Sequence, residues 1–394
     1  MKKPNDSVNG YCDYEPIDVH HASTGPLAGL TLGVKDIYSV KGYPNGWGSP
    51  TKLAETGPDN FNAPTIQKML DAGAEVTGKT HCDELCYSLN GINAHYGAPI
   101  NSAAPDRVTG GSSCGSAALV AVGVVDIATG SDTGGSVRAP ASYCGLIGLR
   151  TTHGRISLEG TMPLAHSFDV FGWFTQNIEN YQKVGDVLLG DDVSDTPLNR
   201  PLTIDALDDC LLGDAERNFY AGAFKQVVDI LGEPETISGF EKPLNDWYWT
   251  MRKLQAREAW LEHEDWIINS KPDLGPGVKD RFEFGLDISD DEYADNTIMR
   301  KAMREELAAI LGDDGVLIMP TVPSAAPLRD AAHESLQEFR EKALELLCVS
   351  GLSGFPQITL PLAQVYGAPL GISLLGPAGS DQRLIGLAAQ IMNR

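Results

Sequence analysis

The sequence lacks long apolar runs, which argues against an integral membrane protein. No run reaches the roughly 18 residues that a membrane-spanning helix needs, and the longest candidate, 116–130, is interrupted by Asp126. The opening residues, MKKPNDSVNGYCDYEP, contain two lysines but no apolar segment behind them, which excludes a secretory signal peptide. We therefore expect a cytoplasmic chain with no membrane partner.

Cysteine is sparse and irregularly placed. The seven cysteines form an odd, scattered set, which does not suit a disulfide framework. Cys82 and Cys86 have no second cysteine pair or histidine pair that would complete a zinc site. We interpret the cysteines as small buried side chains in a reducing compartment and expect no metal; they are residues 12, 82, 86, 114, 144, 210 and 348.

Basic residues are also few compared with acidic ones. The 394 residues include 30 Lys and Arg against 53 Asp and Glu, a formal charge of −23. An acidic surface repels phosphate backbones, and the basic residues form no local cluster, so we expect no nucleic-acid partner. A solvated surface explains the acidity more simply than adaptation to salt. The apolar content of 42% and the charged content of 21% suit an ordinary globular protein.

Apolar patterning predicts alternating strands and helices. This alternation favours an α/β fold with a layered sheet, and we expect one domain over 1–394 in which 205–310 forms a helical insert or cover. Segment 117–129 is buried on all sides and fits a helix, a strand, or one followed by the other. A short strand leading into a loop is expected within 33–40, and further strands at 74–78 and 315–320 and in a hairpin of 357–362 with 370–375. Helices are expected at 64–72, 216–231, 254–268, 299–311 and 335–348.

Two short motifs point to chemistries that their context does not support. GAEVTGKT, Gly73–Thr80, fits the phosphate-loop pattern, but that loop needs a strand before it and a helix after it. Here we expect the reverse order. GSSCG, 111–115, fits the nucleophile elbow of a Ser-His-Asp esterase with Ser113 at its centre, and His153 and His166 are available. The preceding segment is not a clear strand, so the esterase is a lesser alternative.

A third pattern covers a long tract. The sequence GGSSCGSAALVAVGVVDIATGSDTGGSVRAPASYCGLIGLRTTHGRIS closely resembles the defining segment of the amidase signature family, and Ser112 and Ser136 are twenty-four residues apart, as that family's two catalytic serines are. The closer resemblance is to plant-type indole-3-acetamide hydrolases and their bacterial relatives. It runs from about residue 28 to 390 and includes the stretches DELCYSLNGINAHYGAP, MPLAHSFDVFGWF, GVLIMPTVP and SGFPQITLPL.

The resemblance implies a central mixed β-sheet covered by helices on both faces, and it assigns a catalytic triad. Amide hydrolysis needs a nucleophile, a base that later protonates the departing amine, and donors for the oxyanion. The resemblance gives these roles to Ser136 as nucleophile, Ser112 as proton relay and Lys35 as base, with a cis peptide between Gly111 and Ser112. Lysine is a poor base in water, whereas burial disfavours its ammonium form.

The residues around Ser136 have supporting roles in this interpretation. Thr133, Gly134, Gly135 and Ser136 would present backbone N–H groups to the oxyanion, since glycine leaves the approach to the carbonyl open. The helix that starts near Ser136 would add its positive dipole end. Asp132 and Arg138 are expected to hold the loop as a charged pair, with separate solvation as the alternative. Ser113 is retained as loop support, and Cys114 is a tolerated small residue.

The sequence says less about the substrate. Tyr87, Asn93 and His95 lie in a family-like stretch and are candidate substrate-binding residues. The resemblance suggests a small or arylalkyl primary amide and no cofactor. A tRNA-dependent amidotransferase A subunit uses the same triad and is the main alternative, although the −23 charge argues against it. A non-enzymatic relative would lack part of the triad. The oligomeric state is not predicted.

Overall fold

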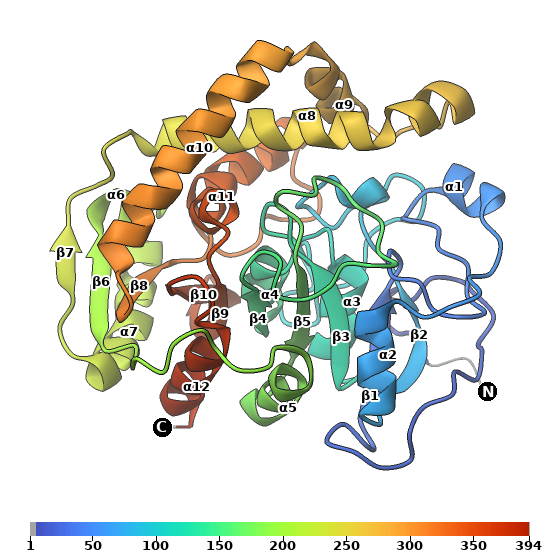
Figure 1. The fold of residues 1–394 in the computed structure, drawn as a ribbon, viewed down its shortest axis with the longest axis horizontal. Helices are drawn as coiled ribbons and strands as arrows, with labels where there is room; N and C mark the ends of the chain where they lie inside the picture. The colour runs from blue at the N-terminus through green and yellow to red at the C-terminus, as the bar shows by residue number, and fades with distance from the viewer. Residues whose placement is uncertain (1–4, 394) are drawn as a thin grey trace.

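A ten-stranded mixed sheet runs through the molecule, with helices on both of its faces (Figure 1). The computed structural model describes residues 5–393. The strand order is β2-β1-β3-β5-β4-β9-β10-β8-β6-β7. The strands are β1 Thr31–Lys35, β2 Glu75–Thr80, β3 Ile127–Ser131, β4 Ile147–Arg150, β5 Phe171–Thr175, β6 Arg200–Ile204, β7 Glu235–Ile237, β8 Gly315–Pro320, β9 Gln357–Val365 and β10 Ala368–Leu375.

Parallel pairs lie at the two ends of the sheet and antiparallel pairs in its middle. β1 pairs in parallel with β2 and β3 at one end, and β6 pairs in parallel with β8 and β7 at the other. Between them, β9 and β10 form a hairpin whose turn, Tyr366 and Gly367, has positive φ at both residues, as tight hairpins prefer. The expected hairpin is confirmed, with longer strands than the sequence predicted.

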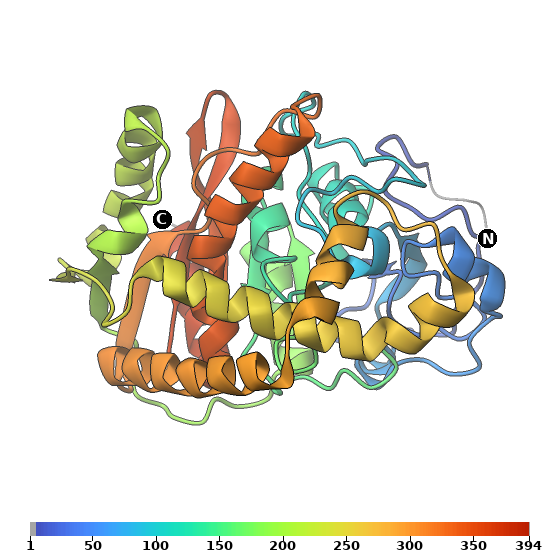
Figure 2. The same ribbon diagram turned by 90° about the horizontal axis from the view of Figure 1, so that it is seen from above.

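The helices include short ones beside the strands and long ones at one side of the molecule. Helices α8, α9 and α10 lie together, and α8 also packs against α11 (Figures 1 and 2). The helices are α1 Pro50–Glu55, α2 Pro64–Asp71, α3 Cys114–Ala121, α4 Arg138–Cys144, α5 Ile178–Leu188, α6 Asp205–Asp208, α7 Asp214–Leu231, α8 Leu244–Ser270, α9 Val278–Asp287, α10 Asp290–Leu311, α11 His333–Ser353 and α12 Asp381–Met392.

Two local expectations agree with the structure. The short strand expected to lead into a loop within 33–40 is β1, which ends at Lys35 because the Lys35 carbonyl accepts the N–H groups of Ile37 and Tyr38 in a tight turn. Segment 117–129 contains the last part of a helix followed by the start of a strand, α3 and then β3. Residues 205–310 hold α6 to α10 and the short strand β7, which the helical prediction missed. That this stretch is an insert stays a prediction.

None of the helices within residues 5–393 is both long and apolar enough to cross a membrane. The candidate site lies within this α/β domain, beside β1 and β3, which are neighbouring parallel strands of the sheet.

Candidate active site

Lys35 is the last residue of β1 and lies fully buried beside β3. Its Nζ donates to the Oγ atoms of Ser112 at 2.8 Å, Ser131 at 2.8 Å and Ser113 at 3.1 Å. Burial of an amine is costly unless each of its polar groups has a partner. The three serine hydroxyls satisfy this need, and no carboxylate within the described residues forms an ion pair with Lys35 Nζ.

Ser112 and Ser113 come from the turn before α3. The peptide bond between Gly111 and Ser112 is cis, as the resemblance implied. The Ser112 carbonyl accepts the backbone N–H of Asp83, and both serines are fully buried. The structure thus brings Ser112 and Ser113 together with Lys35, although 77 residues of chain separate Lys35 from Ser112.

Ser136 lies in the loop between β3 and α4. Its side chain is 3% exposed, and within residues 5–393 its Oγ makes no hydrogen bond. Helix α4 begins two residues later, at Arg138, with Val137 as its N-cap. Ser136 Oγ makes no hydrogen bond to the described residues and is not one of the fully buried polar atoms, so it is open to an approaching group.

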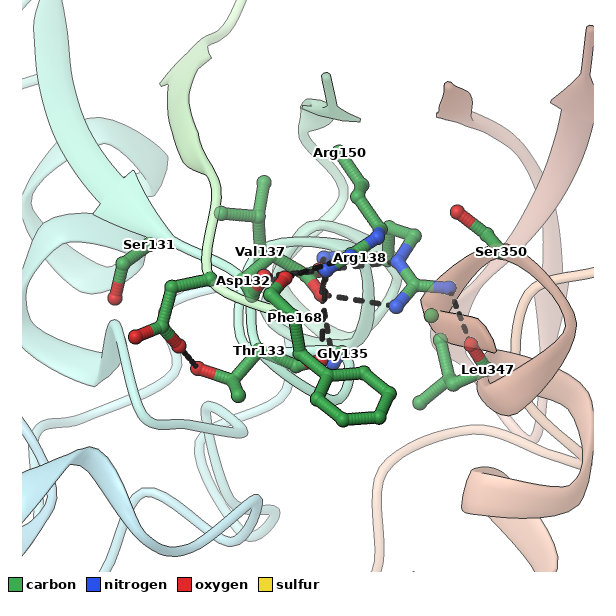
Figure 3. Close-up of polar contacts among 12 residues, drawn as sticks. Ser131, Asp132, Thr133, Gly135, Val137, Arg138, Arg150, Phe168, Leu347 and Ser350 are labelled. Carbon is green, nitrogen blue, oxygen red and sulfur yellow. Dashed lines mark hydrogen bonds and ion pairs between the residues drawn. The ribbon is translucent and has the colours of Figure 1, made fainter. Parts of the chain in front are cut away.

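The carboxylate of Asp132 organises this loop (Figure 3). Its Oδ1 accepts from Gly135 N at 2.8 Å and from Arg138 Nη2 at 2.9 Å, and its Oδ2 accepts from Val137 N and Arg138 Nε. Arg150 adds a second cation, with Nη1 3.0 Å from Oδ1. Burial would raise the pKa of Asp132, but the charges of Arg138 and Arg150 outweigh it and hold the pKa well below its usual range. The expected Asp132–Arg138 pair is confirmed, and the separately solvated alternative is wrong.

This network bears on the predicted oxyanion donors. The Gly135 N–H donates to Asp132, so it is not free to bind an oxyanion. Within the described chain no acceptor takes the backbone N–H groups of Thr133, Gly134 or Ser136. Their role at the oxyanion stays a prediction, and Gly135 is better described as a residue that shapes the loop.

A cavity of about 360 Å³ opens beside the loop. Ser131 and Thr133 lie on its wall with Cys86, and Asp169 holds the Thr133 hydroxyl at 2.5 Å. Burial raises the pKa of Asp169 to about 6. The rest of the lining is mostly apolar and also includes His153 and His166; its apolar side chains include Ile156, Leu158, Met162, Leu164 and Val170.

Cys86 is a site residue that the sequence analysis missed. Its thiol hydrogen-bonds with Cys82, Ser112 and Lys35. Burial would raise the thiol pKa, but the Cys82 hydrogen bond and the Lys35 charge outweigh it and lower the pKa to about 6. Leu85 and Cys86 both have positive φ, an uncommon conformation for residues other than glycine.

Two further residues were missed because only the fold brings them to the site. Ser131, the last residue of β3, contacts Lys35, and Arg150, the last residue of β4, contacts Asp132. Both lie inside the tract that carries the resemblance, which was the one available signal. Their partners are distant in sequence, so no local pattern marks them.

The three candidate substrate-binding residues do not line this cavity. The Asn93 amide donates to the Gly48 and Cys82 carbonyls, and Asn93 is buried as part of the loop scaffold. His95 Nε2 lies 3.0 Å from Glu84 Oε1. Tyr87 is buried, with a hydroxyl that lacks a hydrogen-bond partner. A substrate role for them stays a prediction.

The structure disfavours both alternative motifs. In GAEVTGKT the helix α2 precedes the strand β2, as expected, and Lys79 is buried with its Nζ 3.5 Å from Asp36 Oδ1. In GSSCG the Ser113 hydroxyl contacts Lys35, and within residues 5–393 it has no histidine partner. His153 instead contacts the His166 carbonyl. No group of three or more metal-ligating side chains gathers within the same residues.

Comparisons with known proteins identify the family of this chain. The sequence matches the family described as Amidase over residues 13–244 and 252–385. It is 36% identical to "Amidase 1" of Arabidopsis thaliana, covering 97% of each chain, and 36% identical to "Amidase 1" of Oryza sativa subsp. japonica, covering 93% of this chain and 90% of that protein. A solved amidase crystal structure superposes with a TM-score of 0.80 at 30% identity, covering 94% of this chain and 85% of the other. The chain therefore belongs to the amidase family, and it is an enzyme that hydrolyses the C–N bond of amides.

Proposed function

We propose that the enzyme hydrolyses a small primary amide with an apolar, arylalkyl acyl group, releasing a carboxylate and ammonia. The observation that carries this proposal is the buried Lys35 amine in contact with the Ser112 hydroxyl, 2.8 Å away. A neutral amine has a lone pair and two N–H bonds, so it can accept a proton from one serine while it donates to the other two.

In the proposed reaction Ser136 attacks the amide carbonyl. Its proton passes to Ser112, and Ser112 passes its own proton to Lys35. Backbone N–H groups of Thr133, Gly134 and Ser136 support the oxyanion. When the tetrahedral intermediate collapses, the proton returns through Ser112 to the departing nitrogen, leaving an ester on Ser136. Water then attacks this acyl-enzyme by the same route and regenerates the serine.

The cavity supports the proposed substrate class. It is large enough for a small organic molecule, and its wall from Ile156 to Leu164 is mainly apolar. An aromatic or alkyl group buried there would gain hydrophobic free energy, while the amide would lie near Thr133 and Ser131. We also propose a cytoplasmic location, which the free state of the seven cysteines supports.

The test is ammonia release from indole-3-acetamide, phenylacetamide and acetamide. We expect the wild type to prefer the two aryl substrates, and Ser136→Ala and Lys35→Ala to lose at least about 10³-fold in kcat/KM. Ser194→Ala, far along the chain in an exposed loop, is the control. Full activity in Ser136→Ala would contradict the triad, and loss confined to Ser113→Ala would favour the esterase elbow. A wild type that is inactive without a partner chain would favour the amidotransferase subunit.

A further inference from the structure

Three arginines from three helices gather around Tyr87. Arg252 comes from α8, Arg281 from α9 and Arg340 from α11. The Arg281 guanidinium lies 5.5 Å from the centre of the Tyr87 ring, and all three cations are close enough to influence the titration of its hydroxyl. Arg281 is 5% exposed and Arg340 is 4% exposed. The group is a buried concentration of positive charge in a chain whose net charge is −23.

These arginines have no carboxylate partner. Within residues 5–393 none of them forms an ion pair, and the Nε atom of each is buried without a hydrogen-bond acceptor, as are Nη1 of Arg252 and the Tyr87 hydroxyl. Asp83 influences Arg281 electrostatically, but it is not within ion-pair distance, and its Oδ2 accepts the Gly91 N–H. Buried charges are normally paired, because an unpaired one is costly.

The pKa values of two of these arginines reflect the same excess of unpaired positive charge. Burial, together with the neighbouring Arg252 charge, lowers the pKa of Arg281 to about 10. Burial and the charges of Arg281 and Arg252 also hold the pKa of Arg340 well below its usual range. Arg281 and Arg340 thus lie in an unfavourable positive field, which an anion bound beside Arg281 would reduce.

Arg281 faces a cavity of about 310 Å³. A Cβ placed on Gly277 would lie 3.1 Å from Arg281 Nη1, 3.6 Å from Gln337 Nε2 and 3.6 Å from the ring carbon Cε1 of His333, so these three side chains lie close together. Arg329 lies on the same wall. Glu84 also lines the cavity, but His95 and the Gly275 N–H hold its two oxygens.

We propose that this second cavity binds a small oxyanion, a carboxylate or a phosphate, through Arg281. A guanidinium presents parallel N–H donors that match two oxygens of such a group, which a spherical chloride cannot offer. Arg329 and His333 add donors at the rim, and the volume suits a small organic acid.

One short segment of the chain contributes to both this cavity and the cavity of about 360 Å³ beside the Ser136 loop. The segment from Asp83 to Asn90 places Cys86 on the first cavity and Glu84 and Ser88 on the second, and no residue lines both. The oxyanion has two possible sources, a free anion or the acidic end of an amide substrate. The experiment separates them.

The binding arm measures Tm and calorimetric binding with sodium phosphate and with succinate, against chloride at equal ionic strength. We expect wild type to gain about 2 °C or more with either oxyanion at ten times its Kd. Arg281→Gln should lose this response, yet its Tm in chloride should not fall below that of wild type, because the charge removed is unpaired. Arg217→Gln, in an exposed part of α7, should respond as wild type does. A merely structural Arg281 would instead leave the variant less stable in every buffer.

The source arm compares ammonia release from succinamic acid and from butanamide, which differ by a carboxylate. A preference for succinamic acid that Arg281→Gln abolishes identifies the substrate as the source, whereas an oxyanion response without that preference identifies a free ligand. This arm rests on the proposed function, and the binding arm does not. The proposal is overturned if wild type shows neither response, or if Arg281→Gln retains the wild-type response.

Discussion

At the scale of single residues, the Asp132 carboxylate accepts more hydrogen bonds than any serine side chain of the proposed triad makes. Its two oxygens hold two arginines and the backbone N–H groups of Gly135 and Val137, all in the buried interior (Figure 3). The loop that carries Ser136 is therefore held in place by ion pairs and hydrogen bonds to the buried Asp132 carboxylate. The free energy of this arrangement belongs to the network as a whole, since each member compensates another.

We expect Asp132→Asn to be strongly destabilising, because it leaves Arg138 and Arg150 buried without a counter-charge. The expected loss is about 3–5 kcal/mol of unfolding free energy, measured by urea denaturation, with amidase activity lost as the loop shifts. Asp314→Asn is the matched control. It removes a half-exposed partner of Arg200 and should cost about 0–1 kcal/mol. Equal losses in the two variants would show that the network contributes no more than a surface ion pair.

Cys86 gives a second prediction at this scale. Its pKa is lowered to about 6, so the thiolate is present above pH 6 and disappears below it. We expect iodoacetamide to modify Cys86 rapidly at pH 7, with the rate halved near pH 6, followed by mass spectrometry. Cys210 is more exposed, but burial raises its pKa to about 12, which makes it the control thiol. Faster modification of Cys210 at pH 7 would show that access, not thiolate character, decides the reaction.

At the scale of secondary-structure elements, the sequence predicted what local patterns encode. The hairpin of β9 and β10, the order of α2 and β2, and the strand β8 follow from apolar runs and turn residues. Lys35, Ser112, Asp132 and Arg138 were found only through the family resemblance. What remained hidden were contacts between distant elements, such as Arg150 on β4 reaching Asp132 after β3. Such contacts depend on strand order, which no short pattern reports.

The loop before α4 allows a test of one such contact. Gly135 has φ +126°, and a Cβ there would lie 2.4 Å from Leu347 of the fully buried face of α11. We expect Gly135→Ala to cost about 1–3 kcal/mol and to reduce kcat, because Ser136 is the next residue. Gly190→Ala is the control, since its φ is also positive, +64°, but no atom lies within 4 Å of the added methyl group. If both variants lose equal stability and keep activity, the packing of α11 against this loop is unimportant.

At the scale of the whole molecule, the excess of acidic residues dominates. Paired charges cannot account for it, because 53 acidic residues face only 30 basic ones, and part of the basic set is buried around Tyr87 and Asp132. The surface therefore repels itself at neutral pH, and that repulsion favours expansion of the chain. Salt screens this long-range repulsion between surface charges and has little effect on the buried Asp132 network.

We therefore expect Tm to rise when potassium chloride is increased from about 10 mM to about 0.15 M, over which the screening length falls from about 30 Å to about 8 Å. Salt also weakens exposed ion pairs such as Lys225 with Asp229, which lowers Tm, but these pairs contribute little individually. Whether Tm rises or falls with salt therefore shows which is larger, the screening of net-charge repulsion or the weakening of exposed ion pairs. Calorimetry in chloride alone keeps the proposed oxyanion site out of the comparison. A Tm that falls as salt rises would mean that surface ion pairs, and not the net charge of −23, control the stability of the molecule.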